Sequence, residues 1–384
     1  MKNMSMIEIM KYNPIEDIKK AVADPNKIVI MSTAPAVRVA LGEMFGKPAG
    51  HFVEGKMVAA LRKLGADYVF DINFGADMTI MEESAELVDR IKNGTGKLPQ
   101  FTSCCPGWVN FVEKSFPEII PHLSTAKSPI GMHGPTIKTY FAKENNIDPN
   151  NIVNVVLTPC TIKKFEINRE EMNAAGIEYG NPEMRDMDYC ITTVELGNWL
   201  KEEKISFDDM QDSNFDDFMG SGAGAIFGKT GGVMEAAIRT AYYIVNGKNP
   251  DPDFVKATPV RGFDGIREAT IDLGGTEVRV AVVHGLANAK AIVEQTLSGN
   301  CPYHFVEIMT CKGGCISGPG QPPTDDDGRK ARIAALQNKD DNMTIRHCHE
   351  NPSIKEVYDK KYKEPLSHEA HKVLHTKYGN YPKK

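Results

Sequence analysis

The sequence predicts an α/β protein built from two packed lobes. From Lys27 to Thr310, short apolar segments of strand length alternate with longer amphipathic segments, which is typical of helices that cover a β-sheet. The chain has 384 residues, and a single hydrophobic core stops growing at roughly 250–300 residues. We therefore expect at least two lobes. Apolar residues make up 41% and charged residues 25% of the chain, as in soluble globular proteins.

The predicted strands are rich in Val, Ile and other apolar residues and are mostly buried. In chain order they span residues 27–33, 67–72, 151–158, 189–193, 277–285 and 304–310. Helical spacing of apolar residues predicts helices over 84–92, 233–245 and 287–297. A Gly/Pro/Asp-rich stretch, 318–330, ends this pattern, and a polar, charged segment follows. We expect a first lobe over 1–145, a second over 146–322 and a C-terminal tail over 323–384.

Composition excludes several classes of protein. The net charge of −6 gives no reason to expect nucleic acid or an anionic membrane as partner. No apolar run approaches the roughly 20 residues of a membrane span, and the first residues lack the pattern of a signal peptide. We expect a cytoplasmic protein. In that compartment cysteines serve metals or chemistry more often than disulfides.

Five of the eight cysteines fall in three short motifs. Cys104 and Cys105 are neighbours in "SCCP", Cys160 ends "TPC", and Cys311 and Cys315 enclose "CKGGC". Side chains of neighbours in an extended segment point to opposite sides, so the first pair cannot easily bind one metal centre together. If "CKGGC" begins a helix, its two cysteines share a face. With one thiolate from each other motif they would complete the ligands of a 4Fe–4S cluster. Buried free thiols and a zinc site are the alternatives.

The residues around these cysteines resemble a known family. "FTSCCPGW", "TPCTIKKFE" and "EIMTCKGGCISGPGQP" resemble, in order, the signature segments of the iron-only (FeFe) hydrogenases. Further similar stretches cover 33–43, 73–91, 123–129 and 224–241, and 367–378 resembles the small subunit of some members. The resemblance implies two lobes, each a small mixed β-sheet flanked by helices, with the metal cluster at the lobe interface. The tail would wrap around the outside.

The resemblance also implies a cofactor and a reaction. The cofactor, the H-cluster, is a 4Fe–4S cluster linked to a two-iron subcluster with carbon monoxide, cyanide and a bridging azadithiolate. Its cluster ligands would be Cys105, Cys160, Cys311 and Cys315, with Cys315 bridging to the two-iron centre. The reaction is the reversible combination of two protons and two electrons into molecular hydrogen. Partners would be ferredoxin or an electron-transfer subunit, and the hydrogenase maturation proteins. No cysteine precedes Cys104, so no N-terminal ferredoxin-like domain is expected.

By the same resemblance Cys104 would pass protons to the bridging amine. A free thiol titrates near pKa ~8.5, so it is neutral at working pH yet exchanges protons. Glu83, Ser124, Glu86 and Arg90 would continue this relay to water. The spacing of the two glutamates and the arginine places them on one helical face. A solvent-exposed acidic face with an ion pair is the alternative.

The resemblance assigns further residues to the two-iron centre. Lys163 would donate to a cyanide ligand, although a surface lysine, or the neighbouring Lys164, is the alternative. Met309 would contact the bridging carbon monoxide, and Pro35 and Phe227 would line the pocket.

Four residues depart from the family pattern. Thr158 stands where many members have methionine, Pro319 interrupts a run of glycines, Ile130 replaces a polar amide and Ala36 replaces a serine. We expect these changes to affect rate, bias or oxygen sensitivity rather than the reaction.

Other patterns carry less weight. "AGAIFGKT", 223–230, matches a loose phosphate loop but does not follow a buried strand. His368, His371 and His375 share a helical spacing, and we favour surface histidines of a docked tail helix over a zinc or nickel site; the same holds for "HCH", 347–349. Cys190 and Cys301 are expected to be buried apolar residues.

The functional alternatives are a hydrogen-sensing relative with slow turnover, a non-catalytic iron–sulfur assembly protein and a phosphate-loop enzyme. A basic patch around Lys312 is our hypothesis for docking an electron donor.

Overall fold

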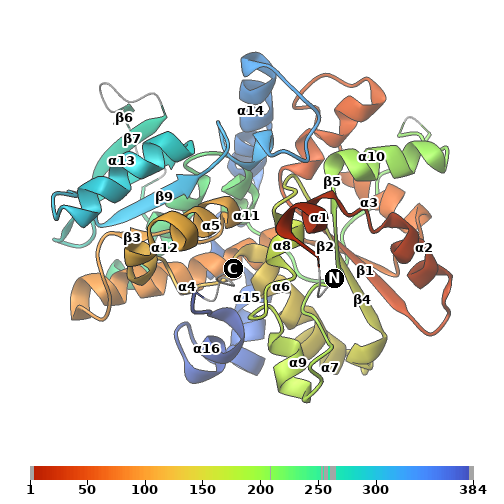
Figure 1. Cartoon of the computed structure of the whole chain (residues 1–384), viewed down its shortest axis with the longest axis horizontal. Coiled ribbons are helices and arrows are strands. Elements are labelled where there is room, and N and C mark those ends of the chain that lie inside the picture. Colours follow the sequence, from red (N-terminus) through yellow and green to blue (C-terminus); the bar gives the residue numbers. More distant parts are fainter. Residues whose placement is uncertain (1–3, 208, 252–253, 255–257, 260–264, 380–384) are drawn as a thin grey trace.

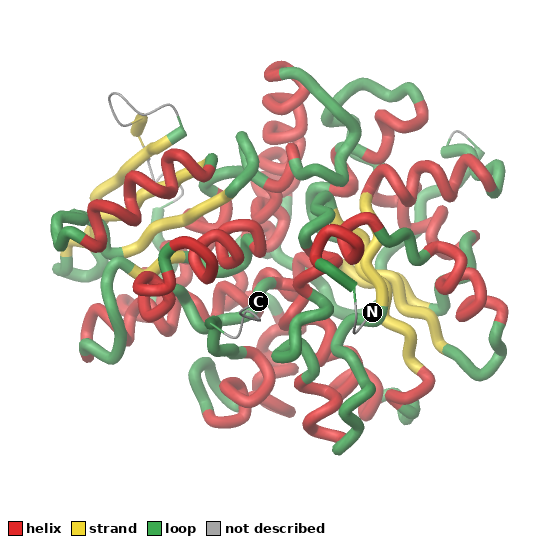
Figure 2. Tube along the Cα trace, in the orientation of Figure 1, coloured by secondary structure: helices red, strands yellow, loops and turns green. Residues whose placement is uncertain are grey.

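The computed structural model describes residues 4–207, 209–251, 254, 258–259 and 265–379. Two β-sheets stand apart, with helices between and around them (Figures 1 and 2). This arrangement confirms the predicted α/β fold with two small sheets. None of the helices in these ranges is long and apolar enough to cross a membrane.

The first sheet is entirely parallel. Its strand order is β2-β1-β4-β5, with β2 at Tyr68–Asp71, β1 at Ile28–Thr33, β4 at Ile152–Thr158 and β5 at Tyr189–Thr192. Parallel neighbours need crossover connections, and helices such as α3 (Glu54–Lys63) lie in these connections. A mixed sheet was expected in each lobe. This sheet is instead all parallel, because each pair of neighbouring strands is joined by a crossover connection and not by a hairpin.

The second sheet is mixed, as expected. Its strand order is β3-β9-β8-β7-β6, with β3 at Gln100–Phe101, β9 at Phe305–Met309, β8 at Glu277–His284, β7 at Ile266–Asp272 and β6 at Thr258–Pro259. β3, β9 and β8 are parallel to one another, whereas β7 is antiparallel to both of its neighbours, β8 and β6.

The two lobes interleave along the chain. The boundary expected near residue 145 does not separate the sheets, because β4 and β5 join β1 and β2, while β3 pairs with β9. Helix α4, Ile72–Asn93, contacts α6 (Pro129–Thr136) and α12 (Gly232–Asn246). It is much longer than the predicted 84–92, because its first half is buried on every side and shows no amphipathic pattern.

The C-terminal tail packs around the outside of this framework. It contains α14 (Asp326–Asn342), α15 (Pro352–Val357) and α16 (His368–Leu374). α15 contacts α4, and α16 contacts α6. The remaining α-helices are α1 Met6–Lys11, α2 Ile15–Ala23, α5 Pro106–Ser115, α7 Ala142–Glu144, α8 Lys163–Glu166, α9 Ala174–Tyr179, α10 Thr193–Glu202, α11 Gly222–Ala225 and α13 Leu286–Leu297.

Candidate functional site: a thiol-lined cavity between the sheets

A cavity lies where strands of both sheets end. Segments that follow β1 and β4 of the first sheet line it, and so do segments that follow β3 and β9 of the second. The carboxyl ends of parallel strands are the usual place for ligand sites in α/β proteins. Its wall includes Pro35, Ala36, Cys104, Cys105, Ile130, Thr158, Cys160, Lys163, Phe227, Met309, Thr310, Cys311 and Cys315.

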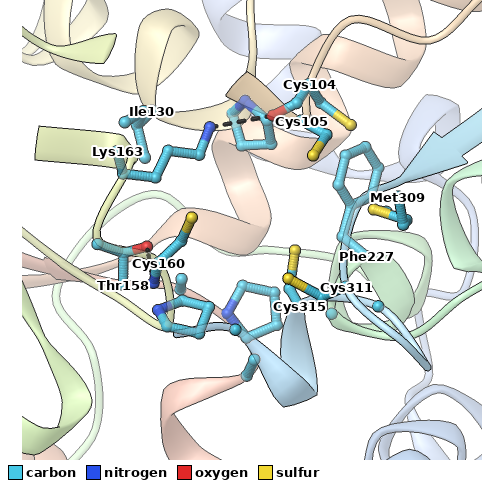
Figure 3. A pocket seen from close by; sticks show the side chains of 18 of the residues that line it. Cys104, Cys105, Ile130, Thr158, Cys160, Lys163, Phe227, Met309, Cys311 and Cys315 are labelled. Atoms are coloured by element: carbon cyan, nitrogen blue, oxygen red, sulfur yellow. Dashed lines mark hydrogen bonds between the residues drawn. The ribbon is translucent and has the colours of Figure 1, made fainter. Parts of the chain in front are cut away.

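All four predicted metal ligands line this cavity. Cys105, Cys160, Cys311 and Cys315 come from three distant parts of the chain, and Figure 3 shows their side chains around one space. Burial raises the pKa of the Cys315 thiol, and Cys105, Cys160 and Cys311 then raise it further. Cys315 is therefore close to all three other cysteines. In the described ranges, no three His, Cys, Asp or Glu side chains converge tightly enough for a single metal ion. Thiolates are the ordinary ligands of iron–sulfur clusters.

The "CKGGC" segment reaches the cavity by a turn and not by the predicted helix. Gly313 and Gly314 have φ angles of 82° and 97°, a left-handed backbone that favours glycine. A Cβ atom on Gly314 would lie 2.5 Å from the backbone nitrogen of Thr230. The turn brings both Cys311 and Cys315 to the cavity, so the shared face expected of a helix is replaced by a tight reversal of the chain.

Cys104 and Cys105 both line the cavity, which differs from the expectation that they face opposite sides. They lie in an irregular segment between β3 and α5 rather than in a strand, so strict alternation does not apply. Burial raises the pKa of Cys104 well above its ordinary value, and the nearby Glu83 raises it further. Cys104 thus lies between the cysteine group and the first predicted relay carboxyl.

The predicted relay residues are together and buried. Helix α4 presents Glu83, Glu86 and Arg90, and each is at least nine-tenths buried, so the solvent-exposed alternative is wrong. The Ser124 hydroxyl donates to Glu86 Oε2 over 2.7 Å, and Arg90 Nη2 donates to Glu86 Oε1 over 2.6 Å. Ser124 and Arg90 therefore hold one carboxyl, that of Glu86, while the Glu83 carboxyl lies near both Cys104 and Glu86.

The surroundings of Glu83 favour its protonated form. Neither of its carboxyl oxygens has a hydrogen-bond partner among the described residues. Burial raises the pKa of Glu83 to about 8, the like charge of Glu86 adds to the rise, and Ser124 offsets only part of it. A carboxyl that titrates near neutral pH both donates and accepts protons under working conditions.

Lys163 lines the cavity, whereas its neighbour Lys164 does not. The Lys163 Nζ donates to the Cys104 carbonyl over 3.1 Å and lies 2.6 Å from Glu166 Oε2. Burial lowers the pKa of Lys163, and Glu166 with smaller contributions from Cys104 and Cys160 more than offsets this, so the net pKa is raised. Lys164 pairs with Glu195 away from the cavity.

The other predicted pocket residues are also in place. Pro35, Phe227 and Met309 line the cavity together with Ala36 and Ile130. Except for its cysteines, Lys163 and two threonines, the wall is apolar or glycine. Such a wall keeps water from a bound group.

Two of the residues that depart from the family pattern, Thr158 and Pro319, differ in their position relative to the cavity. Thr158 lines the cavity, and its hydroxyl accepts a hydrogen bond from the backbone N–H of Cys160 over 3.2 Å. It therefore shapes the turn that carries a predicted ligand. Pro319 is exposed and does not line the cavity, although Gly318 beside it does.

Sequence reasoning missed supporting residues. Thr310 Oγ1 lies 3.4 Å from Cys105 Sγ and 3.8 Å from Cys311 Sγ, which places a hydroxyl between two predicted ligands. Glu166, which pairs with Lys163, stands in the quoted "KKFE" at the i,i+3 spacing of a helical ion pair. That spacing was the available signal for Glu166. Thr310 adjoins Cys311 but had no distinguishing pattern.

The structure agrees with some of the expectations for the remaining cysteines, the histidines and the "AGAIFGKT" segment and differs from others. Cys190 is buried, as predicted, and Cys301 is partly buried against the core. His375 is not a surface histidine, because it is buried and hydrogen-bonded to Glu82. His349 is also buried, and it stacks on Tyr243. The "AGAIFGKT" segment forms α11 and a 3-10 turn, and its Phe227 belongs to the cavity wall.

The fold and the cavity place this chain among α/β proteins that gather four thiols around a cavity at the junction of two sheets. Residues 27–319 match the family model for the iron only hydrogenase large subunit, C-terminal domain, and residues 326–380 match that for the iron hydrogenase small subunit. The chain belongs to the iron-only hydrogenase family.

Individual proteins agree with this family. Iron hydrogenase 1 of Clostridium pasteurianum is 43% identical over 95% of this chain, which spans 63% of that protein's length. A solved FeFe-hydrogenase structure, concerned with oxygen inactivation and degradation of the 2Fe subcluster of the H cluster, superimposes with a TM-score of 0.85. It is 39% identical, and the match covers 96% of this chain and all of that one. The cytosolic Fe-S cluster assembly factor narfl of Xenopus tropicalis is 30% identical over 97% of this chain and 78% of its own length.

Proposed function

We propose that this chain catalyses the reversible reduction of protons to molecular hydrogen. The observation that carries the proposal is the pairing of two features at one cavity. Four thiols from both lobes surround it, and Cys104 beside them leads to a buried line of proton-carrying side chains. A protein that only stored or delivered iron–sulfur clusters would need the first feature but not the second.

The residues present fit the H-cluster of the family. Cys105, Cys160, Cys311 and Cys315 would hold the 4Fe–4S part, because thiolates are its ordinary ligands. Burial raises the pKa of Cys160, Cys311 and Cys315, so these three are thiols without iron, and iron binding must release their protons. When bound, the cluster and its two-iron subcluster supply the electrons and the open site for hydrogen chemistry.

The protein supplies protons and a fixed environment. Cys104 would exchange a proton with the reacting group and recover it from Glu83, which is protonated at neutral pH because burial raises its pKa to about 8. Glu83 in turn would be reloaded from Glu86 through the Ser124 hydroxyl. Arg90 fixes the outer carboxyl by its 2.6 Å hydrogen bond.

Lys163 and Met309 would orient the two-iron subcluster. The Lys163 ammonium is the only cationic side chain among the described cavity-lining residues, so it is the natural donor to an anionic ligand such as cyanide. Glu166 holds that ammonium in place from behind. The Met309 thioether lines the opposite part of the wall, where it would contact a carbon monoxide ligand (Figure 3).

We further propose a ferredoxin or an electron-transfer subunit as electron partner, and the hydrogenase maturation proteins as the source of the two-iron subcluster. The basic patch proposed around Lys312 finds little support. Lys312 is exposed but lies 3.2 Å from Asp326, which also pairs with Arg329. A cytoplasmic location remains our proposal, supported by eight cysteines that are all free thiols.

The test is anaerobic reconstitution of the purified chain with the 4Fe–4S cluster and the two-iron precursor. We expect sharp carbon monoxide and cyanide bands in the infrared spectrum that shift between oxidised and reduced samples, together with hydrogen evolution from a reduced dye. Bands with very slow turnover would favour the hydrogen-sensing alternative. A 4Fe–4S signal without any such bands would contradict the proposal.

The second candidate is a non-catalytic iron–sulfur assembly protein. The 30% identity to the assembly factor of Xenopus tropicalis over nearly the whole chain favours it. Delivery of a preformed 4Fe–4S cluster from this chain to an apoprotein, without any hydrogen evolution, would support this candidate. The buried relay of Glu83, Ser124 and Glu86 has no evident task in it.

A further inference from the structure

The hydrogen bonds of the relay continue past Glu86 into the C-terminal tail. The Thr125 N–H donates to Glu86 Oε2 over 3.0 Å, and the Thr125 hydroxyl lies 3.3 Å from Glu86 Oε1. The same hydroxyl lies 2.8 Å from His375 Nδ1. Backbone hydrogen bonds between 125–127 and 374–376 fix this approach, with Thr376 N–H donating to the Thr125 carbonyl over 2.8 Å.

The hydrogen-bond partners of the His375 ring show which of its nitrogens carries a hydrogen. Its Nε2 lies 2.8 Å from Glu82 Oε2, and the backbone N–H of Leu366 donates to that same oxygen. The oxygen is therefore an acceptor, and Nε2 carries a hydrogen. In the neutral imidazole Nδ1 is then left as an acceptor, whereas in the imidazolium Nδ1 also carries a hydrogen.

The charge state of His375 consequently sets the direction of one hydroxyl. Thr125 has a single hydroxyl hydrogen and two possible acceptors, Nδ1 at 2.8 Å and Glu86 Oε1 at 3.3 Å. Beside a neutral imidazole the hydrogen is donated to Nδ1. Beside an imidazolium, Nδ1–H donates to the hydroxyl oxygen, and the hydroxyl hydrogen turns to Glu86.

We propose that Thr125 and His375 are positioning residues that control how readily Glu86, the outer carboxyl of the relay, takes up and releases protons. The inference rests on the proposed function. An imidazolium adds a positive charge and a fourth donor to a carboxylate that already accepts from Arg90, Ser124 and the Thr125 N–H, so it favours the ionised form. Beside a neutral imidazole, Glu86 has neither that positive charge nor the hydrogen bond from the Thr125 hydroxyl, so it keeps a proton more easily.

Other charged and titratable groups also face His375. Glu82 and Glu86 approach it from α4, and the Tyr358 hydroxyl donates to Glu82 from the tail. His371 of α16 lies with its ring centroid 4.2 Å from that of His375, and it is exposed. Of these, only Glu82 and Thr125 are hydrogen-bonded to the His375 ring, which makes His371 a matched control.

The consequence is a pH-dependent bias. At low pH the imidazolium drives protons from Glu86 inward, which supports hydrogen evolution. At high pH the neutral ring lets Glu86 accept protons on their way out, which supports hydrogen uptake. His375→Gln donates to Glu82 and accepts from Thr125 as the neutral ring does, but it cannot be protonated.

The first experiment uses the reconstituted full chain. The ratio of evolution to uptake should change less between pH 6 and pH 8 in His375→Gln than in the unsubstituted protein or His371→Gln. Thr125→Val should reproduce His375→Gln, and Thr125→Ser should restore the original profile. Identical profiles for His375→Gln and the unsubstituted protein would overturn the proposal.

The second experiment needs no cofactor. NMR of the full chain with 15N-labelled histidine follows the titration of His375, identified by its loss in His375→Gln. If the two groups are coupled, removing the charge of Glu86 in Glu86→Gln should move the observed titration of His375 to lower pH, because a nearby negative charge favours the imidazolium. An unchanged midpoint overturns the coupling even if hydrogen is evolved. A shifted midpoint in a chain that evolves no hydrogen would leave the coupling intact and refute only the proposed function.

Discussion

At the scale of single residues, the site depends on polar groups kept away from water. Cys104 and Glu83 are buried and Lys163 is partly buried, and burial together with nearby charged groups displaces the pKa of each. Buried groups of this kind destabilise a fold, so they are found mostly where function requires them. Glu83 is the clearest case, because its carboxyl oxygens lack partners in the described structure.

The first prediction concerns Glu83 and stability. Its pKa is raised from 4.5 to about 8 in the folded chain, so between these pH values the folded state holds a proton that the unfolded state has released. The free energy of unfolding should therefore fall as pH rises through this range, by at most about 1.4 kcal/mol per pH unit from this group. Urea unfolding of the cofactor-free protein from pH 5 to pH 8 should show a shallower fall for Glu83→Gln.

The control is Glu16→Gln, at an exposed position of α2. It should leave the slope unchanged. Parallel curves for the unsubstituted protein and Glu83→Gln would mean that Glu83 is ionised in the folded state, and the relay would need another proton store.

The second prediction concerns Cys104. Replacing a proton donor at a reacting centre typically costs about 10²–10⁴-fold in rate. In Cys104→Ala we expect the iron content and the infrared bands to stay close to those of the unsubstituted protein, while hydrogen evolution falls by that factor. Cys301→Ser, at a partly buried position outside the cavity, should retain the rate. Loss of the infrared bands in Cys104→Ala would instead identify Cys104 as a ligand.

At the scale of elements, the tail supports the ligand turn. Arg332 of α14 is fully buried and donates to the Ile316 carbonyl over 2.7 Å, next to Cys315. It also donates to the Pro322 carbonyl and to both carboxylate oxygens of Glu43. One guanidinium therefore connects the tail, the turn after Cys315 and the segment after β1.

The third prediction follows from this connection. Lysine cannot reproduce the planar, forked donors of arginine. Arg332→Lys should lower the free energy of unfolding by about 3 kcal/mol and reduce the iron retained after anaerobic reconstitution. Lys330→Met, at an exposed position of the same helix, is the control and should change neither. Full iron retention in a destabilised Arg332→Lys would show that the turn holds the cluster without help from α14.

Elements also show what the sequence could and could not predict. The six buried strands were found within a residue or two, because continuous apolar runs mark them. β7 escaped prediction because its exposed face is polar, and β3 because two residues carry no pattern. The cysteines and the lysine that line the cavity stand in short local motifs of the sequence, so their meeting there could be anticipated. Thr310, Arg332 and His375 gain their roles only from contacts with segments far away in the chain, which local patterns do not encode.

At the scale of the whole molecule, the cavity joins the two lobes. Cys160 follows a strand of the first sheet, whereas Cys105, Cys311 and Cys315 follow strands of the second. A bound cluster would therefore cross-link both lobes. The two tryptophans report on them separately, since Trp199 packs in the core of the first sheet and Trp108 in that of the second.

The fourth prediction uses these reporters. Ligand present at about 100 times its dissociation constant stabilises a protein by about 2.7 kcal/mol, which raises the melting temperature of a chain of this size by roughly 3 °C. In anaerobic melts of Trp108→Phe and Trp199→Phe, loading the 4Fe–4S cluster should raise both midpoints together. Adding Cys160→Ser should reduce the rise at both, whereas Cys190→Ala should not, because Cys190 lies outside the cavity. If only the Trp108 reporter responds, the first sheet contributes no ligand, and the cluster is held by the second lobe alone.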